Sequence, residues 1–376
     1  MKTAFLYTEK YFAYDYGASH PLKIERLRLT CDLCKAYDLF SLPDTGLIET
    51  RPASESDILR FHTPEYVEAL KRAGCGRITG DFSYGLGPGD NPVFPGLWAW
   101  SQLYTGASLQ CAELVSGGKA DIAFNIAGGL HHAGDRQASG FCYINDPVLA
   151  IYHFVDKGKR VLYLDIDAHH GDGVQWAFYE DPGVLTVSFH QDGRTLFPGT
   201  GGLGEIGRGN GLGYAVNIPM LPGTDDHVFW EGFKSVVPVL MEIFNPDVVV
   251  SQLGVDTFMD DPLAALELTT NGFCMAISYL AEQGLPWVAL GGGGYNPSNV
   301  ARAWTLGWAI MNGLDLPEDL PESMVKPLSA RGHHGRKLRD PQHQSPRQGK
   351  CLRRMQECLE YLETKVFPKI KVRNVI

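Results

Sequence analysis

Acidic and histidine residues lie where short apolar runs end, and their spacing is that of a metal site. Asp165, Asp167 and His169 alternate at the end of one run, and alternation along a strand places side chains on the same side. Asp256, which follows another run, can supply a further ligand. Asp167, His169 and Asp256 would leave a coordination position open for water and substrate, as catalytic sites do. Zinc is the favoured metal, although this oxygen-rich set could also hold Fe(II) or Co(II).

Two adjacent histidines, His131 and His132, follow a pair of glycines after another apolar run. One imidazole can take a proton from metal-bound water while the other stays protonated, provided that different carboxylates tune the two pKa values. Asp165 and Asp172 are the obvious partners, because each lies near the metal segment and neither is needed as a ligand. A surface loop that happens to carry two histidines is the alternative.

Four consecutive glycines at 291–294 precede Tyr295. The run lacks both the G-x-G-x-x-G pattern and the lysine of phosphate-binding loops. A flexible segment that brings Tyr295 to the site explains it better, since the phenol could donate a hydrogen bond to an oxyanion formed opposite the metal. A tyrosine with a structural role at a loop corner is the alternative.

The residues named so far follow apolar runs that predict buried strands. These runs are 121–126, 160–166, 184–189, 248–253 and 287–290, and two more at 3–7 and 214–218 could extend the sheet. These runs lack a strict alternation of apolar and polar residues, and this pattern is typical of parallel strands that are covered on both faces. Helices are expected at about 21–38, 55–72, 97–116, 143–156, 226–244, 271–283 and 299–312. We therefore expect an α/β protein in which the carboxyl ends of the strands, including the one before His190, meet in one crevice.

The composition is that of a globular protein of one large domain or two modest ones, with 376 residues of which 44% are hydrophobic. No run reaches the ~18 apolar residues of a membrane helix, so a cytoplasmic protein that does not enter a membrane is expected. The net charge of −10 argues against direct nucleic-acid binding and favours cationic ligands. Eight cysteines are expected as reduced thiols, and the pair Cys31 and Cys34 lacks the second pair of a zinc finger.

From about residue 314 the character of the chain changes. Residues 326–354 hold nine Lys and Arg against one acid and are rich in Pro, Gly, Gln and His, which indicates a loop-like basic segment. A final helix that packs on the body is expected from the helical spacing of Leu352, Met355, Leu359 and Leu362. We therefore expect a catalytic domain at 1–313, followed at 314–376 by a basic loop and this helix.

Taken together, the motifs resemble those of the zinc-dependent histone deacetylase family, in particular its class I branch and the bacterial deacetylase-like proteins. The similarity covers about residues 5–312. The motifs that match in order and spacing are 20–26, 128–133, 139–145, 165–174, 197–201 and 291–295. The resemblance implies the arginase/deacetylase α/β fold, in which helices sandwich an eight-stranded, mostly parallel sheet.

The resemblance also implies roles for single residues. One zinc ion would be bound by Asp167, His169 and Asp256. Protons would be handled by His131 with Asp165 and by His132 with Asp172, and Tyr295 would polarise the acyl carbonyl. Substrate would contact Phe141 and Phe197 as the walls of a narrow tube, together with Gly140, Leu263, the rim residue Asp90 and Arg26 of an internal acetate cavity. One potassium ion would lie near Asp165, Asp167, His169, Ser188 and Phe189, and another near Phe178, Asp181, Val184 and Tyr214.

The two histidines are expected to be unequal. Asp165 would also face the metal and a potassium ion, whereas Asp172 follows the strand and lies further toward solvent. A carboxylate raises the pKa of its histidine and nearby cations lower it. His132 is therefore expected to be the easier of the two to protonate and to act as the principal general base.

The implied activity is hydrolysis of acetyl or other acyl groups from lysine side chains of proteins or peptides, with hydroxamates as inhibitors. Deacetylation of acetylated polyamines or other small amides is the alternative, and a noncatalytic acyl-lysine binder is a third possibility. Gly171 and Phe258 stand where the binuclear manganese relatives carry aspartates, so a second catalytic metal is not expected. Pro262 and Ser298 replace basic residues that bind inositol phosphate in corepressor complexes, which puts such docking in doubt although Lys23 is kept.

Overall fold

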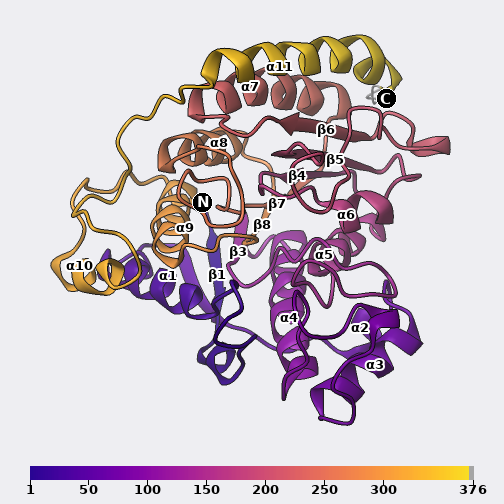
Figure 1. The fold of residues 1–376 in the computed structure, drawn as a ribbon, viewed down its shortest axis with the longest axis vertical. Coiled ribbons are helices and arrows are strands. Elements are labelled where there is room, and N and C mark those ends of the chain that lie inside the picture. The colour runs from indigo at the N-terminus through magenta and orange to yellow at the C-terminus, as the bar shows by residue number, and fades with distance from the viewer. Residues whose placement is uncertain (372–376) are drawn as a thin grey trace.

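One eight-stranded sheet runs through the molecule, and helices cover both of its faces (Figure 1). The computed structural model describes residues 1–371. The strands are β1 (Thr3–Tyr7), β2 (Thr45–Glu49), β3 (Ile122–Asn125), β4 (Val161–Asp165), β5 (Val184–Gln191), β6 (Ala215–Met220), β7 (Val248–Gln252) and β8 (Trp287–Leu290). Their order is β2-β1-β3-β8-β7-β4-β5-β6, and every neighbouring pair is parallel. The predicted fold class is confirmed, with all strands parallel rather than most of them.

Helices connect successive strands and fill both faces of the sheet. They are α1 (Glu25–Ala36), α2 (Glu55–Ile58), α3 (Pro64–Gly74), α4 (Leu97–Ser116), α5 (Asp146–Val155), α6 (Asp172–Ala177), α7 (Asp226–Phe244), α8 (Thr270–Glu282), α9 (Pro297–Met311), α10 (Glu322–Ser329) and α11 (Gln348–Tyr361). Shorter helical turns cover Glu9–Ala13, Phe82–Tyr84, Gly209–Gly211, Leu362–Val366 and Phe367–Lys369.

Burial on both faces explains why the strand sequences lack alternation. Leu162 and Leu164 of β4 belong to a core cluster that also contains side chains of α7, α8 and α9. Val161 and Tyr163, which alternate with them, belong to a second cluster with side chains of α4 and α5. Each of these four β4 residues is therefore covered by helices on its own side of the sheet, and an apolar residue is favourable at all four positions.

Some expected elements differ from the structure. Strand β2 was not predicted, because it lies at the edge of the sheet and is only partly buried. The helix expected at 55–72 is divided into α2 and α3, and α3 begins at Pro64, where a proline suits the first turn. The basic segment is not a continuous loop, because α10 covers its first residues and α11 its last.

The expected final helix is present as α11, which packs on α7 and along β6. Met355 lies against Gly232 of α7, and the Cys351 thiol lies 3.8 Å from the Pro222 carbonyl oxygen. Basic residues before it pair with nearby acids, as Arg331 does with Glu25 at 2.7 Å. The division of the chain at residue 313 stays a prediction, and the last five residues of the proposed segment lie outside the described ones.

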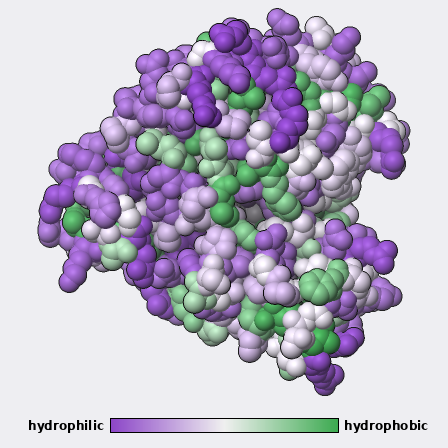
Figure 2. Space-filling model, in the orientation of Figure 1, coloured by the Kyte–Doolittle hydropathy of each residue, from purple (hydrophilic) through white to green (hydrophobic). Residues whose placement is uncertain are grey.

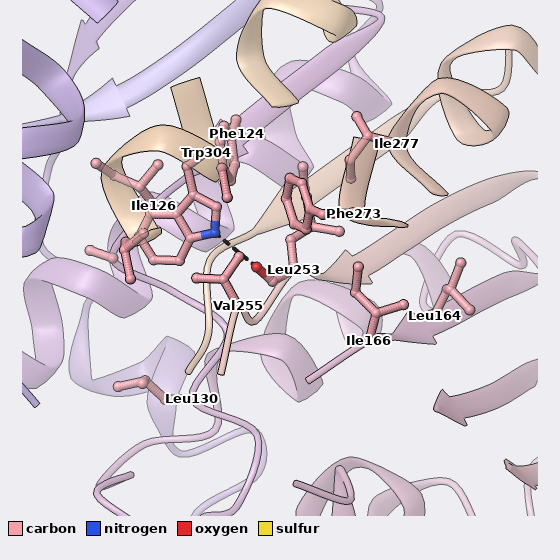
Figure 3. Packing of buried hydrophobic residues seen from close by; sticks show 14 of the residues in the cluster. Phe124, Ile126, Leu130, Leu164, Ile166, Leu253, Val255, Phe273, Ile277 and Trp304 are labelled. Carbon is pink, nitrogen blue, oxygen red and sulfur yellow. Dashed lines mark hydrogen bonds between the residues drawn. The ribbon is translucent and has the colours of Figure 1, made fainter. Parts of the chain in front are cut away.

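A buried tryptophan connects the core to the loop that leaves β7. The Trp304 indole nitrogen on α9 donates a 2.8 Å hydrogen bond to the Leu253 carbonyl oxygen, and Figure 3 shows this bond among the side chains of Phe124, Val255 and Phe273. Because a buried indole N–H needs an acceptor, this contact fixes the backbone just before Asp256.

The surface seen in Figure 2 is largely hydrophilic, and hydrophobic residues gather around a hollow near its centre. None of the helices within residues 1–371 is both long enough and apolar enough to cross a membrane. All eight cysteines are free thiols, and Cys31 and Cys34 are buried in α1 without a partner pair.

Candidate functional site

Neighbouring strands bring most of the predicted site residues to one edge of the sheet. Strands β3, β8, β7 and β4 are consecutive in the sheet, and their carboxyl ends lead to His131, Tyr295, Asp256 and Asp167. Such an edge is where ligands bind in parallel α/β sheets. His190 at the end of β5 does not join this group, because its ring bonds to the Ser188 hydroxyl and the Gly201 carbonyl instead.

The three predicted metal ligands form one buried cluster. Ligand atoms of Asp167, His169 and Asp256 all lie within 4.8 Å of one another. His169 Nδ1 is 2.9 Å from Asp256 Oδ2 and 3.1 Å from Asp167 Oδ1. A Cβ atom at Gly254 or Gly293 would overlap these carboxylates, so both glycines make room for the cluster. Two carboxylates and one imidazole are a suitable donor set for a divalent transition metal.

Hydrogen bonds from outside the cluster orient its carboxylates. Gln252 Nε2 donates to Asp167 Oδ2 at 2.6 Å, and the Gly293 amide donates to the same oxygen at 2.7 Å. The Ala168 amide donates to Asp256 Oδ1 at 2.8 Å. These donors hold the carboxylates close together, as the supporting shell of a metal site does.

The pKa shifts of the cluster show that it needs a positive charge. Burial and the neighbouring Asp167 carboxylate raise the pKa of Asp256 to about 6. Burial opposes protonation of His169, but the two carboxylates outweigh it and raise the His169 pKa to about 10. A proton on His169 thus offsets part of the negative charge of the two buried carboxylates, and a bound divalent cation would offset all of it.

Each tandem histidine has the carboxylate partner that was predicted for it. His131 Nδ1 lies 2.7 Å from Asp165 Oδ2, and His132 Nδ1 lies 2.7 Å from Asp172 Oδ1. The Nε2 atoms of the two histidines are only 3.1 Å apart. Protonation of one ring therefore disfavours protonation of the other.

The order of the two histidine pKa values is opposite to the expectation. Burial disfavours protonation of His131, but Asp165 and Asp167 outweigh it and raise its pKa to about 9. Burial and the charge of His131 lower the pKa of His132, and Asp172 only partly compensates. The expectation included bound cations near Asp165, whereas these pKa shifts arise from the protein alone, in which His131 lies 2.7 Å from the Asp165 carboxylate and 4.0 Å from that of Asp167.

A narrow cavity leads to these groups, and Gly140 and Phe141 form part of its wall. Its lining residues are Leu22, Gly129, Leu130, His131, His132, Gly140, Phe141, Cys142, Asp167, Gly292, Gly293 and Tyr295. Gly140 and Phe141 have left-handed backbone angles, φ +50° and +70°. The strained conformation of Phe141 turns its ring to within 5.6 Å of the Tyr295 ring, measured between centroids. Burial and the Asp256 carboxylate raise the pKa of the Tyr295 phenol well above its usual value, which keeps it a hydrogen-bond donor.

Four predicted substrate residues lie outside that lining. Phe197 is 43% exposed and its ring lies 5.0 Å from the His132 ring, which places it beside the entrance. Asp90 is exposed and lines an adjoining groove with Gly140. Leu263 is half-buried. Arg26 is buried, and its guanidinium donates to the Gly294 and Gly292 carbonyl oxygens at 2.9 and 2.7 Å, so it holds the glycine run that forms part of the cavity wall.

The residues implied for potassium form two groups near β5. Ser188 and Phe189 lie on this strand, and Ser188 is paired with Asp165 of β4 in the sheet. The second group lies around the start of β5, where the Asp181 amide donates to the Phe178 carbonyl oxygen at 3.0 Å, and it also contains Val184 and Tyr214.

Asp261 is a site residue that the sequence analysis missed. It is buried, and its carboxylate accepts hydrogen bonds from the Tyr295 amide at 2.7 Å and from the Leu263 amide at 3.0 Å. Burial and the charge of Asp256 raise its pKa to about 7. Asp261 lies in a loop without periodicity, so no pattern in the sequence marked it.

Asn145 and Asp146 were also missed, although Asn145 belongs to one of the quoted motifs. The Asp146 carboxylate accepts from the Gly129 and Leu130 amides, both at 2.9 Å. Asn145 Nδ2 donates to the His131 carbonyl oxygen at 3.1 Å. The start of α5 therefore fixes the backbone that carries the two histidines.

Comparison with known proteins decides the family. The model of the Histone deacetylase domain matches residues 20–311, which is most of the chain. The chain belongs to the histone deacetylase family. The predicted resemblance is thus confirmed, and membership of this family makes the protein a hydrolase that acts on amides.

Curated relatives in this family cover most of the chain. It is 41% identical over 332 residues to the acetoin utilization protein AcuC of Bacillus subtilis, which corresponds to 86% of this chain and 85% of that protein. It is 40% identical over 324 residues to the histone deacetylase RPD3 of Saccharomyces cerevisiae, which corresponds to 85% of this chain and 74% of that protein.

Solved deacetylase structures share the fold. The crystal structure of a histone deacetylase homologue from Aquifex aeolicus matches with a TM-score of 0.88 and 35% identity, over 96% of this chain and 100% of that one. A structure of a deacetylase homologue in complex with SAHA matches equally well.

Metal loading of this candidate site should release protons. At pH 7 the metal-free His169, with a pKa raised to about 10, carries a proton that it must lose to become a ligand. We expect zinc binding to release at least about one proton per chain, and zinc affinity to rise as the pH rises toward 10. Calorimetric titration of zinc into metal-free protein, in buffers of different ionisation enthalpy, measures this number. Binding without net proton release would contradict it.

Proposed function

We propose that the protein removes acetyl or other acyl groups from lysine side chains, using one zinc ion held by Asp167, His169 and Asp256. The observation that carries this proposal is that one narrow cavity is lined by Asp167 of the ligand cluster, by two histidines that each have a carboxylate partner, and by the Tyr295 phenol. Bound zinc would supply a positive charge that polarises the acyl carbonyl and an attacking water. The family match and the names of AcuC and RPD3 support deacetylation.

His132 is proposed as the group that accepts the proton of the attacking water. Its lowered pKa leaves the ring neutral and able to accept a proton, and Asp172 orients the ring through Nδ1. The same ring would then return the proton to the leaving amine. His131, whose pKa is raised, would contribute a positive charge 3.1 Å from the His132 ring nitrogen.

Tyr295 is proposed as the donor to the carbonyl oxygen as that oxygen gains negative charge. Its ring centroid lies 6.4 Å from that of the ligand His169, so the phenol flanks the metal cluster. The bonds from Arg26 to the glycine run and from the Tyr295 amide to Asp261 hold the phenol there. A preorganised donor of this kind stabilises a tetrahedral oxyanion.

The shape of the cavity supports a slim acyl-amine chain as substrate. Phe141 lines it and Phe197 stands at its entrance, so the methylenes of an acylated lysine would pass between aromatic rings. A polyamine has a similar chain and remains the second candidate. Hydroxamates are expected to inhibit, which the SAHA complex of a structural relative supports.

Several further features are part of the proposal. The two groups of residues around β5 would hold structural potassium ions. Gly171 and Phe258 offer no carboxylate for a second catalytic metal, which supports one zinc ion per chain. Docking to an inositol-phosphate corepressor stays in doubt, and the cytoplasmic location and the absence of direct nucleic-acid binding stay predictions.

Hydrolysis of an acetyl-lysine peptide is the test of the proposed function. Zinc-loaded protein should release acetate from the peptide with a kcat/KM higher than that for acetylated putrescine or spermidine. Removal of zinc by a chelator should abolish the activity, and re-addition should restore it. A higher kcat/KM on the polyamines would favour the second candidate, and no turnover of any acyl amide would favour a noncatalytic binder.

Loss of the Tyr295 hydroxyl should lower the rate without changing the fold. Tyr295→Phe should reduce kcat by about 10²–10³ if the phenol is an oxyanion donor of ordinary strength. Asp261→Ala should also reduce kcat, because it frees the Tyr295 amide. If Asp261 acts through the phenol, its effect should largely disappear in the Tyr295→Phe background. Additive losses in the double variant would mean that Asp261 acts in another way.

The two histidines should differ in their effect on the rate. His132→Ala should lower kcat/KM at least about tenfold more than His131→Ala, because only His132 is expected to transfer the proton. The kcat/KM values of the two variants are compared on zinc-saturated protein whose circular dichroism spectrum matches that of the wild type. Equal losses, or the reverse order, would remove this assignment.

A further inference from the structure

A groove opens beside the candidate catalytic cavity and shares Gly140 with it. It has a volume of about 400 Å³, and its lining residues are Phe82, Gly85, Gly87, Pro88, Gly89, Asp90, Asn91, Ala138, Ser139 and Gly140. Four of these are glycines, so backbone forms much of its surface and few side chains fill the space. A polypeptide whose acyl-lysine enters the cavity would therefore pass next to this groove.

Phe82 forms an apolar wall of the groove. It is 80% exposed, the highest value among the large hydrophobic side chains of residues 1–371. Its ring lies over Gly87, where a Cβ atom would collide with it. An exposed aromatic ring that borders a cavity loses contact with water when an apolar group fills that cavity. Phe82 is thus a suitable contact for an apolar side chain.

The backbone holds Phe82 in a fixed turn. The Asp81 amide donates to the Leu86 carbonyl oxygen at 2.8 Å, and the Leu86 amide donates back at 3.0 Å. The Ala138 amide donates to the Tyr84 carbonyl oxygen at 2.9 Å, which joins this turn to the opposite wall. The groove therefore exists before any ligand arrives, which limits the ordering required for binding.

The second wall belongs to the segment that carries the cavity residues. Asn91 Nδ2 donates to the Cys142 carbonyl oxygen at 3.2 Å, and the Ser139 amide donates to the same oxygen at 3.0 Å. These bonds tie the groove to the turn that contains Gly140 and Phe141. Groove and cavity thus have a fixed relation to each other.

We propose that this groove binds an apolar side chain of the substrate polypeptide, one or two residues from the acyl-lysine, against the ring of Phe82. The inference rests on the proposed function and names a peptide rather than a polyamine as the substrate class. Successive residues of an extended chain are about 3.3–3.6 Å apart, so a near neighbour of the lysine can reach a groove that shares Gly140 with the cavity. A polyamine has no side chain that could fill it.

The charge of the groove disfavours an acidic occupant. Asp90 is the sole charged residue among those that line the groove. Its carboxylate can accept hydrogen bonds from backbone amides of an extended peptide and would repel an acidic side chain. The groove should therefore prefer leucine or phenylalanine to glycine, and disfavour glutamate most.

Peptides that differ at one position test the proposal. Matched acetyl-lysine peptides with leucine, glycine or glutamate beside the lysine, on either side, are compared by kcat/KM and by fluorescence anisotropy. We expect wild-type protein to prefer leucine to glycine by about tenfold, as is common when an apolar group enters a pocket. Phe82→Ala should remove this preference and leave turnover of acetyl-lysine with blocked termini unchanged. Leu212→Ala, which removes another exposed apolar side chain before β6, serves as the control and should retain the preference.

Two results would overturn the proposal. One is wild-type protein that does not distinguish leucine from glycine in turnover or in binding. The other is a preference that survives in Phe82→Ala. Because anisotropy needs no turnover, a leucine preference in binding that Phe82→Ala removes would support the groove even if no acyl amide were hydrolysed, and only the proposed function would then fail.

Discussion

Two carboxylates buried side by side are the constraint on which the catalytic face depends. Asp167 and Asp256 both contact His169 and are almost completely removed from water. Without a positive charge between them their repulsion in a low-dielectric interior would be strongly destabilising. The surrounding backbone amides, the side chain of Gln252 and the space left by two glycines all serve to keep this pair in place. The same arrangement that favours a cation also supplies ligand atoms for one.

Loops carry the other reactive groups, and side chains from distant parts of the chain hold them. The glycine run before Tyr295 has no side chains of its own to pack, and it is fixed by Arg26 and Asp261 from outside. The backbone of the tandem histidines is likewise fixed by Asp146 at the start of α5. Loops can thus hold reactive groups in precise positions, because buried charged side chains form hydrogen bonds with the backbone atoms of these loops.

The sequence predicts the sheet and the chemical groups better than it predicts their supports. Buried strands such as β4 are apolar on both faces and end in polar residues, which makes both the strand and the site visible. Edge strand β2 is half exposed and lacks that signal. Asp261 could not be predicted, since its role depends on a contact between loops 34 residues apart. The order of the two histidine pKa values is not fixed by the sequence, because it depends on which cations occupy the site.

The proposed catalytic groups would recognise only an acyl amide, so they would not distinguish a protein from a polyamine. Asp167, the two histidines and Tyr295 line a narrow cavity, which also contains backbone of the glycine runs. Discrimination must therefore come from whatever lies outside the entrance. There the structure offers a groove built largely from backbone, an exposed aromatic ring and one carboxylate. Such a surface can distinguish the residues that flank an acyl-lysine, whereas it offers a small amine only the charge of the Asp90 carboxylate.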